Sequence, residues 1–249
     1  MNVPRAVRRL LARAGPRARR TLDTYVLSAP EPQNALDIFR DEWASRLPPP
    51  LDHHRAGPHP LFDDERIRWL DREIGGIGGR SALDLGPLEG GHSYMLEKLG
   101  ASEVLAIEGN TRAYLKCLVV KEVLGLRRVH FLCGDILAYQ REGGPRFDLC
   151  LASGVLYQMQ KPVELIDLLS RRCAGFLFVW THYYDPAVIL RERRLARKFD
   201  RGRTDEHGGF RHTLYPYHYR DALDKKGFCG GGAPTSSWLS RDDILRALA

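Results

Sequence analysis

Acidic residues follow three successive apolar segments of this chain. The first segment enters the glycine-bearing turn of residues 84–91 (DLGPLEGG), the second ends at Glu108, and the third is followed by Asp135. If these segments are parallel β-strands, their carboxyl ends meet at one edge of a sheet, where α/β proteins bind nucleotide-like ligands. A carboxylate at the end of the second strand can accept hydrogen bonds from both hydroxyls of a ribose. The spacing therefore favours a site for an uncharged adenosine with free ribose hydroxyls.

The glycines of the turn restrict which ligand it suits. Gly86 allows the backbone to pass close to a ligand, and Gly90 lies at the expected start of a helix. A dinucleotide site requires the pattern G-x-G-x-x-G, whose second glycine admits a pyrophosphate. Leu88 occupies that second position. A nicotinamide oxidoreductase is therefore the weakest of the functional interpretations.

Two residues after the third segment would complete an adenine site. Asp135 can accept a hydrogen bond from the adenine amino group, and Ile136 can pack against the ring. Each acid also has an ordinary structural interpretation. Glu108 can be a surface acid at a strand end, and Asp135 can cap a helix or stabilise a turn. Both interpretations stay open for each acid taken alone.

The elements that would position these residues alternate between strands and helices over residues 81–180. Continuous apolar runs, such as residues 148–152 (DLCLA) and 176–180 (FLFVW), are typical of strands buried on both faces. The alternation predicts right-handed βαβ crossovers and an α/β fold with a doubly wound, Rossmann-like, mostly parallel sheet covered by helices on both faces. Strands are expected at 81–85, 103–107, 128–133, 147–152 and 176–180, and helices at 91–99, 111–124 and 161–173.

Three regions are expected along the chain. Residues 1–60 form a basic tail and a helical, proline-rich extension. Residues 61–180 form the Rossmann-like domain, whose first helix is capped by Asp63 or Asp64. Residues 181–249 form a basic helix, a lid and a C-terminal helix that complete a substrate site.

The helices of the flanking regions are predicted from caps and periodicity. One helix is expected over 32–46, before a run of prolines, and another over 62–74. A basic helix is expected over 186–199, followed by an irregular lid over 200–235 that is rich in glycine, histidine and tyrosine. Ser240 has the sequence context of a capping box and is expected to start the final helix.

The formal net charge of +7 is concentrated at the N-terminus. Residues 1–20 contain seven arginines and no acidic residue, and the remaining chain has 31 basic and 31 acidic residues. This tail could contact RNA, or lie on an anionic membrane as an amphipathic helix with Val7, Leu10 and Leu11 on its apolar side. A solvated extension is the third interpretation.

Cysteine usage and hydropathy exclude several classes of protein. The five cysteines form no CxxC pair, and Cys133 and Cys150 lie in predicted buried strands, which indicates reduced thiols in a cytoplasmic protein. The histidines of residues 52–59 (DHHRAGPH) have no converging partner, so no metal site is predicted. No apolar run reaches the roughly 18–20 residues of a membrane span, and the N-terminus lacks the apolar segment of a signal peptide.

Residues 62–180 resemble the class I S-adenosylmethionine-dependent methyltransferases. The resemblance rests on the turn of residues 84–91, on Glu108 and Asp135, and on residues 147–158 (FDLCLASGVLYQ), which are similar to the family's fourth-strand motif. It is greatest for a bacterial branch that includes wobble-uridine carboxymethyltransferase-like proteins. The cofactor-binding residues that the resemblance implies are Asp84, Gly86, Gly90, Glu108, Asp135, Ile136, Ser153 and Gly154, with the last pair beside the transferred methyl group.

The chain departs from this family at three points. Leu88 replaces the usual central glycine, and Gln158 replaces the usual histidine. The family's sheet normally ends in two further strands that form an antiparallel hairpin at its edge. Only weak strand candidates near 210–219 follow residue 180, so either the edge hairpin is abbreviated or the sequence is a truncated form. Strand five would then be an exposed edge.

The resemblance implies S-adenosylmethionine as cofactor and transfer of a methyl group to an oxygen or nitrogen atom of a small-molecule acceptor. Such an acceptor can need a general base, and His182 and Tyr157 are the expected candidates because they follow strands five and four. Two alternatives stay open: an RNA-modifying methyltransferase that uses the basic tail, and a non-catalytic cofactor-binding interaction domain.

Overall fold

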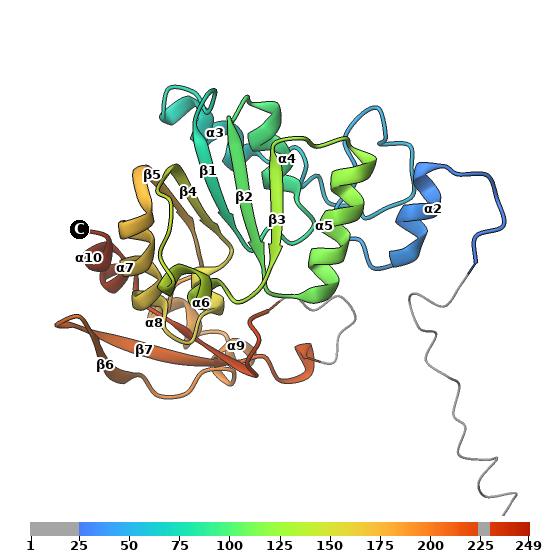
Figure 1. The fold of residues 1–249 in the computed structure, drawn as a ribbon. Helices are drawn as coiled ribbons and strands as arrows, with labels where there is room; N and C mark the ends of the chain where they lie inside the picture. Colours follow the sequence, from blue (N-terminus) through green and yellow to red (C-terminus); the bar gives the residue numbers. More distant parts are fainter. Residues whose placement is uncertain (1–24, 224–229) are drawn as a thin grey trace, which may run out of the picture.

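A five-stranded parallel sheet forms the centre of the computed structural model, which describes residues 25–223 and 230–249. The strand order is β3-β2-β1-β4-β5 (Figure 1). The bounds are β1 (Ser81–Leu85), β2 (Glu103–Glu108), β3 (Val129–Cys133), β4 (Phe147–Ser153) and β5 (Cys173–Trp180). All five strands are confirmed as predicted, and only β5 begins clearly earlier than expected. The doubly wound Rossmann-like fold is confirmed with them.

Helices cover both faces of this sheet because the strand order reverses between β1 and β4. The helices on one face are α3 (Glu65–Glu73), α4 (Gly91–Lys98) and α5 (Thr111–Val123), and those on the other are α6 (Ile136–Arg141), α7 (Pro162–Arg172) and α10 (Arg241–Leu248). Each face of the sheet has its own hydrophobic core, and alternate residues of a strand pack into one core or the other. In β2, Val104 and Ala106 pack into the first core and Ile107 into the second.

Side-chain caps mark where several helices begin. Asp64 caps α3, Asn110 caps α5 and Ser240 caps α10, each by accepting a hydrogen bond from a backbone N–H of the first turn. The caps at Asp64 and Ser240 confirm the prediction. Helix α6 was not predicted, because its six residues are too few to show a clear apolar period.

Two predicted helices are wrong in extent. In place of a helix over 32–46, α2 (Pro32–Leu36) and the 3-10 helix η1 (Asp37–Phe39) are followed by Asp41 with a φ of 64°, which ends helical geometry. The Trp43 indole then donates to the carbonyl of Leu36, 2.8 Å away. In place of a helix over 186–199, the chain forms two short helices, α8 (Pro186–Ile189) and α9 (Arg193–Ala196).

The expected irregular lid is also wrong in part, because the C-terminal region contains a second sheet. Strands β6 (Arg203–His207), β7 (Phe210–His218) and β8 (Thr235–Trp238) are antiparallel, in the order β6-β7-β8, and the 3-10 helix η3 (Arg220–Ala222) follows β7. Gly208 and Gly209 join β6 to β7 with φ values of 56° and 82°, as a two-residue hairpin turn requires.

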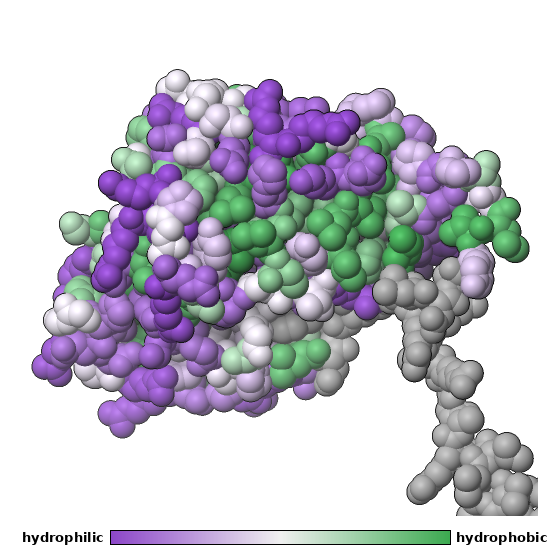
Figure 2. Space-filling view, in the orientation of Figure 1, coloured by the Kyte–Doolittle hydropathy of each residue, from purple (hydrophilic) through white to green (hydrophobic). Residues whose placement is uncertain are grey.

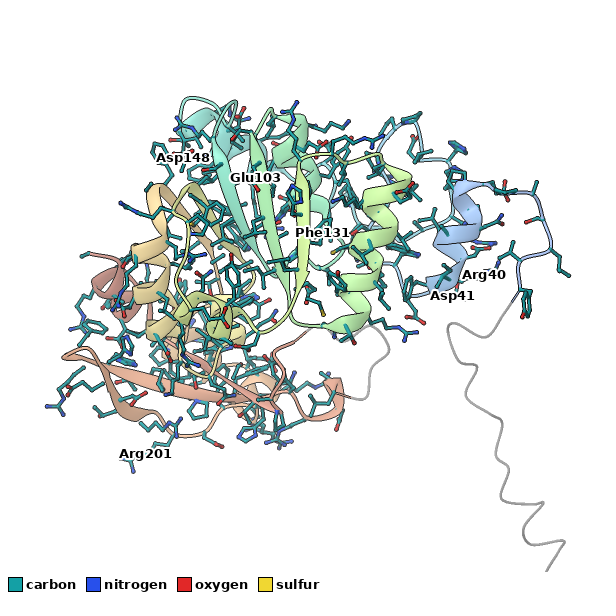
Figure 3. All side chains as sticks on the ribbon, in the orientation of Figure 1. Arg40, Asp41, Glu103, Phe131, Asp148 and Arg201 are labelled. Carbon is teal, nitrogen blue, oxygen red and sulfur yellow. The ribbon has the colours of Figure 1, made fainter. Side chains whose placement is uncertain are left out.

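This second sheet lies below the lower edge of the parallel sheet in Figure 1. Glu103 and Asp148, near the amino ends of β2 and β4, lie at the upper edge (Figure 3). The carboxyl ends of the parallel strands therefore face the second sheet. The hairpin does not pair with β5, so among the described residues the parallel sheet ends at β5, without the family's usual edge hairpin.

Apolar side chains gather over the middle of the face drawn in Figure 2. Leu115 and Leu118 of α5 and Leu132 of β3 are exposed leucines. Cys150 is buried as predicted, but Cys133 is exposed because it ends β3 at the sheet edge.

The expectations for the basic tail concern residues outside the described ranges. None of the described helices has the length and apolar character needed to cross a bilayer.

Candidate functional site

A cavity of about 800 Å³ opens at the carboxyl ends of β1 to β4. Its floor is formed by the turns that follow these strands, and its sides by the N-terminal extension, α3, α4 and Gly230–Gly232. This is the place where a doubly wound sheet binds ligands, because the strand order reverses there. Of the ten predicted site residues, Gly86, Glu108, Asp135, Ile136, Ser153, Gly154 and Tyr157 line the cavity.

Glu108 has the geometry expected of a ligand-binding carboxylate. It is buried, with 8% of its surface exposed, and it lines the cavity. The Leu88 N–H donates to its Oε2 at 3.0 Å and the Asn110 N–H to its Oε1 at 2.8 Å. Each oxygen can accept one more hydrogen bond. Burial raises the pKa of Glu108 despite these hydrogen bonds.

Asp84 is buried beside the glycine turn and does not face the cavity. It is 1% exposed, and the Ser93 hydroxyl, in α4, donates to its Oδ2 at 2.6 Å. Burial raises the pKa of Asp84, and the neighbouring His92 and Ser93 offset this only in part. The carboxyl group therefore ties the end of β1 to the first turn of α4. It is not among the residues that line the cavity.

The turn after β1 depends on three left-handed residues. Gly86 has a φ of 64°, Leu88 of 60° and Gly90 of 82°. Leu88 thus keeps a conformation that favours glycine, at a cost of roughly 1–2 kcal/mol for a side chain with a Cβ. Gly90, which precedes α4, does not line the cavity, and a Cβ there would lie 3.0 Å from the Phe131 ring.

Asp135 both caps α6 and lines the cavity. Its Oδ1 accepts a hydrogen bond from the Ala138 N–H at 2.7 Å, so the N-cap interpretation is confirmed. The cap occupies one oxygen of the carboxylate. Ile136, the first residue of α6, is 8% exposed, and Cys133 also lines this part of the cavity.

The turn after β4 carries Ser153, Gly154 and Tyr157. Gly154 has a φ of 80°, and its N–H donates to the carbonyl of Trp180 at 2.7 Å. The 3-10 helix η2 (Leu156–Gln158) then directs Tyr157 and Gln158 to the cavity. The backbone of Gly231 packs against η2 so closely that a Cβ there would lie 2.5 Å from the carbonyl oxygen of Gln158.

His182 is not among the residues that line the cavity. Its ring stacks on Trp238, with the ring centroids 5.3 Å apart and the planes 8° apart. The Tyr157 ring meets it edge-on at 4.5 Å. Among the described residues His182 therefore lies behind Tyr157, in a cluster of aromatic rings between η2 and the second sheet.

A polar group at one side of the cavity was not predicted from the sequence. His92 and Arg66 line the cavity, and both bind Asp64, the cap of α3. His92 Nε2 lies 2.9 Å from Asp64 Oδ2, and Arg66 Nε lies 2.9 Å from Asp64 Oδ1. The Arg66 guanidinium also lies 5.1 Å from the centre of the Trp180 ring. His92 directly follows the glycine turn in the sequence, and this position could have identified it as a site residue.

The environment of Asp64 favours its charged form. Burial by itself raises the pKa of this carboxyl group, but the hydrogen bonds from His92 and Arg66 outweigh burial and hold the pKa well below the ordinary 3.8. The group thus stays ionised at neutral pH. A carboxylate in this position fixes the orientation of the His92 ring at the cavity wall.

We expect Asp64→Asn to lower the free energy of unfolding by about 1.5–3 kcal/mol at pH 7, since asparagine keeps the cap but loses charge-assisted hydrogen bonds. The pKa of Asp64 is depressed in the folded state, so its contribution is complete above the unfolded pKa and disappears as pH falls through the folded pKa. Urea unfolding from pH 7 downward should therefore show the two proteins converging below about pH 4. The control is Asp63→Asn, whose side chain is 60% exposed. An equal loss in both variants would contradict the argument.

A buried ion pair holds the N-terminal extension against the turn. Glu89 is 1% exposed and accepts hydrogen bonds from the Ala44 N–H at 2.9 Å and the Ser45 N–H at 2.8 Å. Lys116 of α5 donates to the same carboxylate at 2.8 Å and to the carbonyl of Glu42. Gly91 is a second close contact, because a Cβ there would lie 2.4 Å from the carbonyl oxygen of Leu61. The extension therefore forms one wall of the cavity.

No group of three or more potential metal-ligating side chains occurs within residues 25–223 and 230–249. The polar groups around the cavity are instead carboxylates, a histidine, a tyrosine and backbone amides. This arrangement suits an organic ligand with hydroxyl and amino groups.

No protein-family model matches the chain. Two curated relatives do. One is the ribosomal RNA small subunit methyltransferase A of Rhodopseudomonas palustris, 28% identical over 153 residues, which are 60% of this chain and 50% of the relative. The other is the tRNA U34 carboxymethyltransferase of Alcanivorax borkumensis, 28% identical over 131 residues, 49% of this chain and 40% of the relative. The chain thus spans half or less of the length of these relatives.

Solved structures match a larger share of the chain. The N-terminal domain of EvdMO1, crystallised in the presence of SAH and D-fucose, has a TM-score of 0.67 and 20% identity, with 87% of this chain and 83% of that chain covered. An S-adenosylmethionine-dependent methyltransferase from Mesorhizobium loti has a TM-score of 0.50 and 18% identity, with 76% and 80% covered. At these identities the likeness concerns the fold. The resemblance to class I S-adenosylmethionine-dependent methyltransferases is confirmed at that level.

Proposed function

We propose that this chain is an S-adenosylmethionine-dependent methyltransferase that transfers a methyl group to an oxygen or nitrogen atom of a small-molecule acceptor. The observation that carries the proposal is the position of Glu108. Its buried carboxylate lies in a cavity of about 800 Å³, beside the left-handed turn at Gly86, and Asp135 lines the same cavity. The fold and both curated relatives are consistent with this function.

The described residues fit an adenosyl cofactor. Glu108 would accept from the ribose hydroxyls with the lone pairs that its backbone donors leave available. Ile136 would pack on the adenine ring, and the free oxygen of Asp135 would accept from the amino group. Gly86, Ser153 and Gly154 would surround the methionine end, while Asp84 and Gly90 hold the turn from behind.

The bound cofactor supplies an activated methyl group on a sulfonium, so most of the catalysis comes from alignment. The chain's own contribution is to orient the acceptor and to exclude water. Tyr157, at the cavity wall, is proposed as the residue nearest the acceptor, and His182, behind it, as a second candidate base. His92 is a third candidate, since its ring is oriented by Asp64 at 2.9 Å.

A small-molecule acceptor is favoured by the enclosure of the cavity. The N-terminal extension, through Ser45 and Leu61, and Gly230–Gly232 both border it, so an acceptor enters between walls. Outside residues 1–20 the chain is electrically balanced. The structural neighbour with the TM-score of 0.67 was crystallised in the presence of a sugar, D-fucose. These points support a hydroxylated small molecule.

RNA is the second candidate acceptor, because both curated relatives are named for RNA substrates. Arg191, Arg193, Arg194 and Arg197 are exposed in and around α8 and α9, and the tail of residues 1–20 adds seven arginines. Such clusters contact phosphates. A non-catalytic cofactor-binding domain is the third candidate.

To test this, the purified protein is incubated with S-adenosylmethionine that is labelled on the methyl group. Small-molecule, RNA and protein fractions of a cell extract are each added separately as acceptors. We expect label in the small-molecule fraction only. Label confined to RNA would favour the second candidate. Binding of the cofactor without transfer to any fraction would favour the interaction domain.

A further inference from the structure

Asp64 and His92 form a pair that joins two helices at the wall of the cavity. Asp64 caps α3, and His92 is the second residue of α4. The Asp64 Oδ2 atom lies 2.9 Å from His92 Nε2, and its Oδ1 accepts hydrogen bonds from the backbone N–H and the Nε of Arg66, each at 2.9 Å. The carboxylate is therefore fixed by α3, and it fixes the imidazole ring in turn.

The pair leaves one nitrogen of the His92 ring available. Asp64 is ionised at neutral pH. An ionised carboxylate only accepts hydrogen bonds, so in the neutral ring Nε2 carries the proton and Nδ1 carries a lone pair. Nδ1 makes no hydrogen bond to any residue that the structure describes, and it is not one of the buried side-chain atoms left without a partner. Because His92 lines the cavity, the ring offers a bound molecule a proton acceptor.

The pair lies toward the side of the cavity that an adenosyl group leaves open. In the strand order β3-β2-β1-β4-β5, Asp135 follows β3 and Glu108 ends β2. Toward the other end, the Arg66 guanidinium lies 5.1 Å from the centre of the Trp180 ring, at the end of β5. The Trp180 carbonyl accepts from the Gly154 N–H, after β4, at 2.7 Å. With the methyl group beside Gly154, the pair is on the acceptor's side.

We propose that the acceptor atom is a hydroxyl oxygen and that His92, held by Asp64, is the base that takes its proton. This inference rests on the proposed function and narrows its acceptor class. A neutral amine attacks with its lone pair and can lose its proton afterwards, and a carboxylate has no proton to lose. A hydroxyl loses its proton as it attacks, because the oxygen of a protonated ether is strongly acidic. A base beside the acceptor therefore indicates a hydroxyl.

The transfer balances with these groups alone. The hydroxyl oxygen bonds to the methyl carbon while the bond from that carbon to sulfur breaks, and the electron pair of the broken bond stays on sulfur. The hydroxyl proton passes to Nδ1 of His92. Asp64 is a positioning residue, which stabilises the imidazolium through Nε2. The products are a methyl ether and S-adenosylhomocysteine, and the proton on the ring then leaves to solvent.

The other candidate bases fit this role less well. His182 is not among the residues that line the cavity, and its ring stacks on Trp238. Tyr157 does line the cavity. A phenol carries its own proton at neutral pH, however, so it suits a hydrogen-bond donor to the acceptor better than a base.

Nitrogen NMR of the histidine rings tests the pair in the purified protein without cofactor or acceptor. The protein is labelled with nitrogen-15 on histidine and recorded at mildly alkaline pH, and the signals of His92 are those that His92→Gln removes. We expect a proton on Nε2 and none on Nδ1. In Asp64→Asn we expect a mixture of both tautomers, because an amide can donate or accept. A wild-type ring protonated on Nδ1 would overturn the proposal.

Methyl transfer is measured with S-adenosylmethionine labelled with carbon-13 on the methyl group and the small-molecule fraction of a cell extract. We expect the label in a methyl ether, identified by its carbon chemical shift. His92→Gln should lower kcat by about 100-fold or more, with little change in KM for S-adenosylmethionine. Asp64→Asn should also lower kcat rather than raise KM. Added imidazole should restore part of the activity of His92→Ala, which a merely structural histidine would not show.

The matched control is His130→Gln, because His130 is exposed on β3 and is not among the residues that line the cavity. It should transfer as the wild type does. Circular dichroism establishes that each variant is folded. Wild-type transfer by His92→Gln, or label on a nitrogen atom or in a carboxylate ester, would overturn this proposal and leave the proposed function standing. A wild-type protein that labels no small molecule would overturn the proposed function, and this inference with it.

Discussion

Replacing Lys116 with methionine is expected to lower the free energy of unfolding by about 3–5 kcal/mol, because it leaves the buried Glu89 carboxylate without its counter-charge. Lys116 is 5% exposed and Glu89 1% exposed, so solvent screens the pair very little. The variant also loses the hydrogen bond from Lys116 to the carbonyl of Glu42. Urea unfolding followed by circular dichroism measures the change.

The control for this stability prediction is an exposed ion pair of the same chain. Arg171 binds Asp167 at 2.7 Å, but its side chain is 69% exposed. Arg171→Ala should therefore cost less than about 1 kcal/mol. A loss of only that size in Lys116→Met would show that the extension is not anchored through Glu89. Other contacts would then have to hold the N-terminal extension at the wall of the cavity.

The second large effect concerns the cofactor. Glu108→Ala should weaken binding of S-adenosylhomocysteine by about 100-fold, since two charge-assisted hydrogen bonds to the ribose are lost. The variant also removes the acceptor for the Leu88 and Asn110 amides, which shape the turn. The same carboxylate predicts a pH dependence. Because burial raises the pKa of Glu108, wild-type affinity should decline with falling pH earlier than for an ordinary glutamate.

Glu103→Ala is the matched control for the affinity prediction. Glu103 is exposed at the opposite end of the same strand, β2, away from the cavity (Figure 3). It should bind S-adenosylhomocysteine as the wild type does. Removing the ribose hydroxyls from the ligand should weaken its binding to the wild type. The same removal should not weaken its binding to Glu108→Ala any further. Independent losses from the two changes would show that Glu108 does not contact the ribose.

The parallel sheet was predictable because its strands are short apolar runs that alternate with helices. The residues at the strand ends followed from the same pattern, so Gly86, Glu108 and Asp135 were found together. The weak strand candidates near 210–219 correspond to β7, but β6 was missed because its sequence (RTDEH) contains no apolar residue. The Gly208–Gly209 turn was the local signal that could have revealed it.

The polar side chains at the walls of the cavity are held by contacts that cannot be predicted from the spacing of residues in the sequence. Glu89 binds Ala44 and Ser45 across more than forty residues, and His92 binds Asp64 across 28. Only the fold brings these segments together. The surroundings of His182 could not be predicted for the same reason, since only the fold brings the Trp238 and Tyr157 rings against it.

Calorimetric titration of the purified protein can establish whether the cavity binds an adenosyl group that carries no pyrophosphate. S-adenosylhomocysteine and NAD are titrated in parallel into the same folded sample. We expect one S-adenosylhomocysteine bound per chain, with affinity in the micromolar range or better, and no binding of NAD. Binding of NAD, or no binding of S-adenosylhomocysteine by a folded protein, would contradict it.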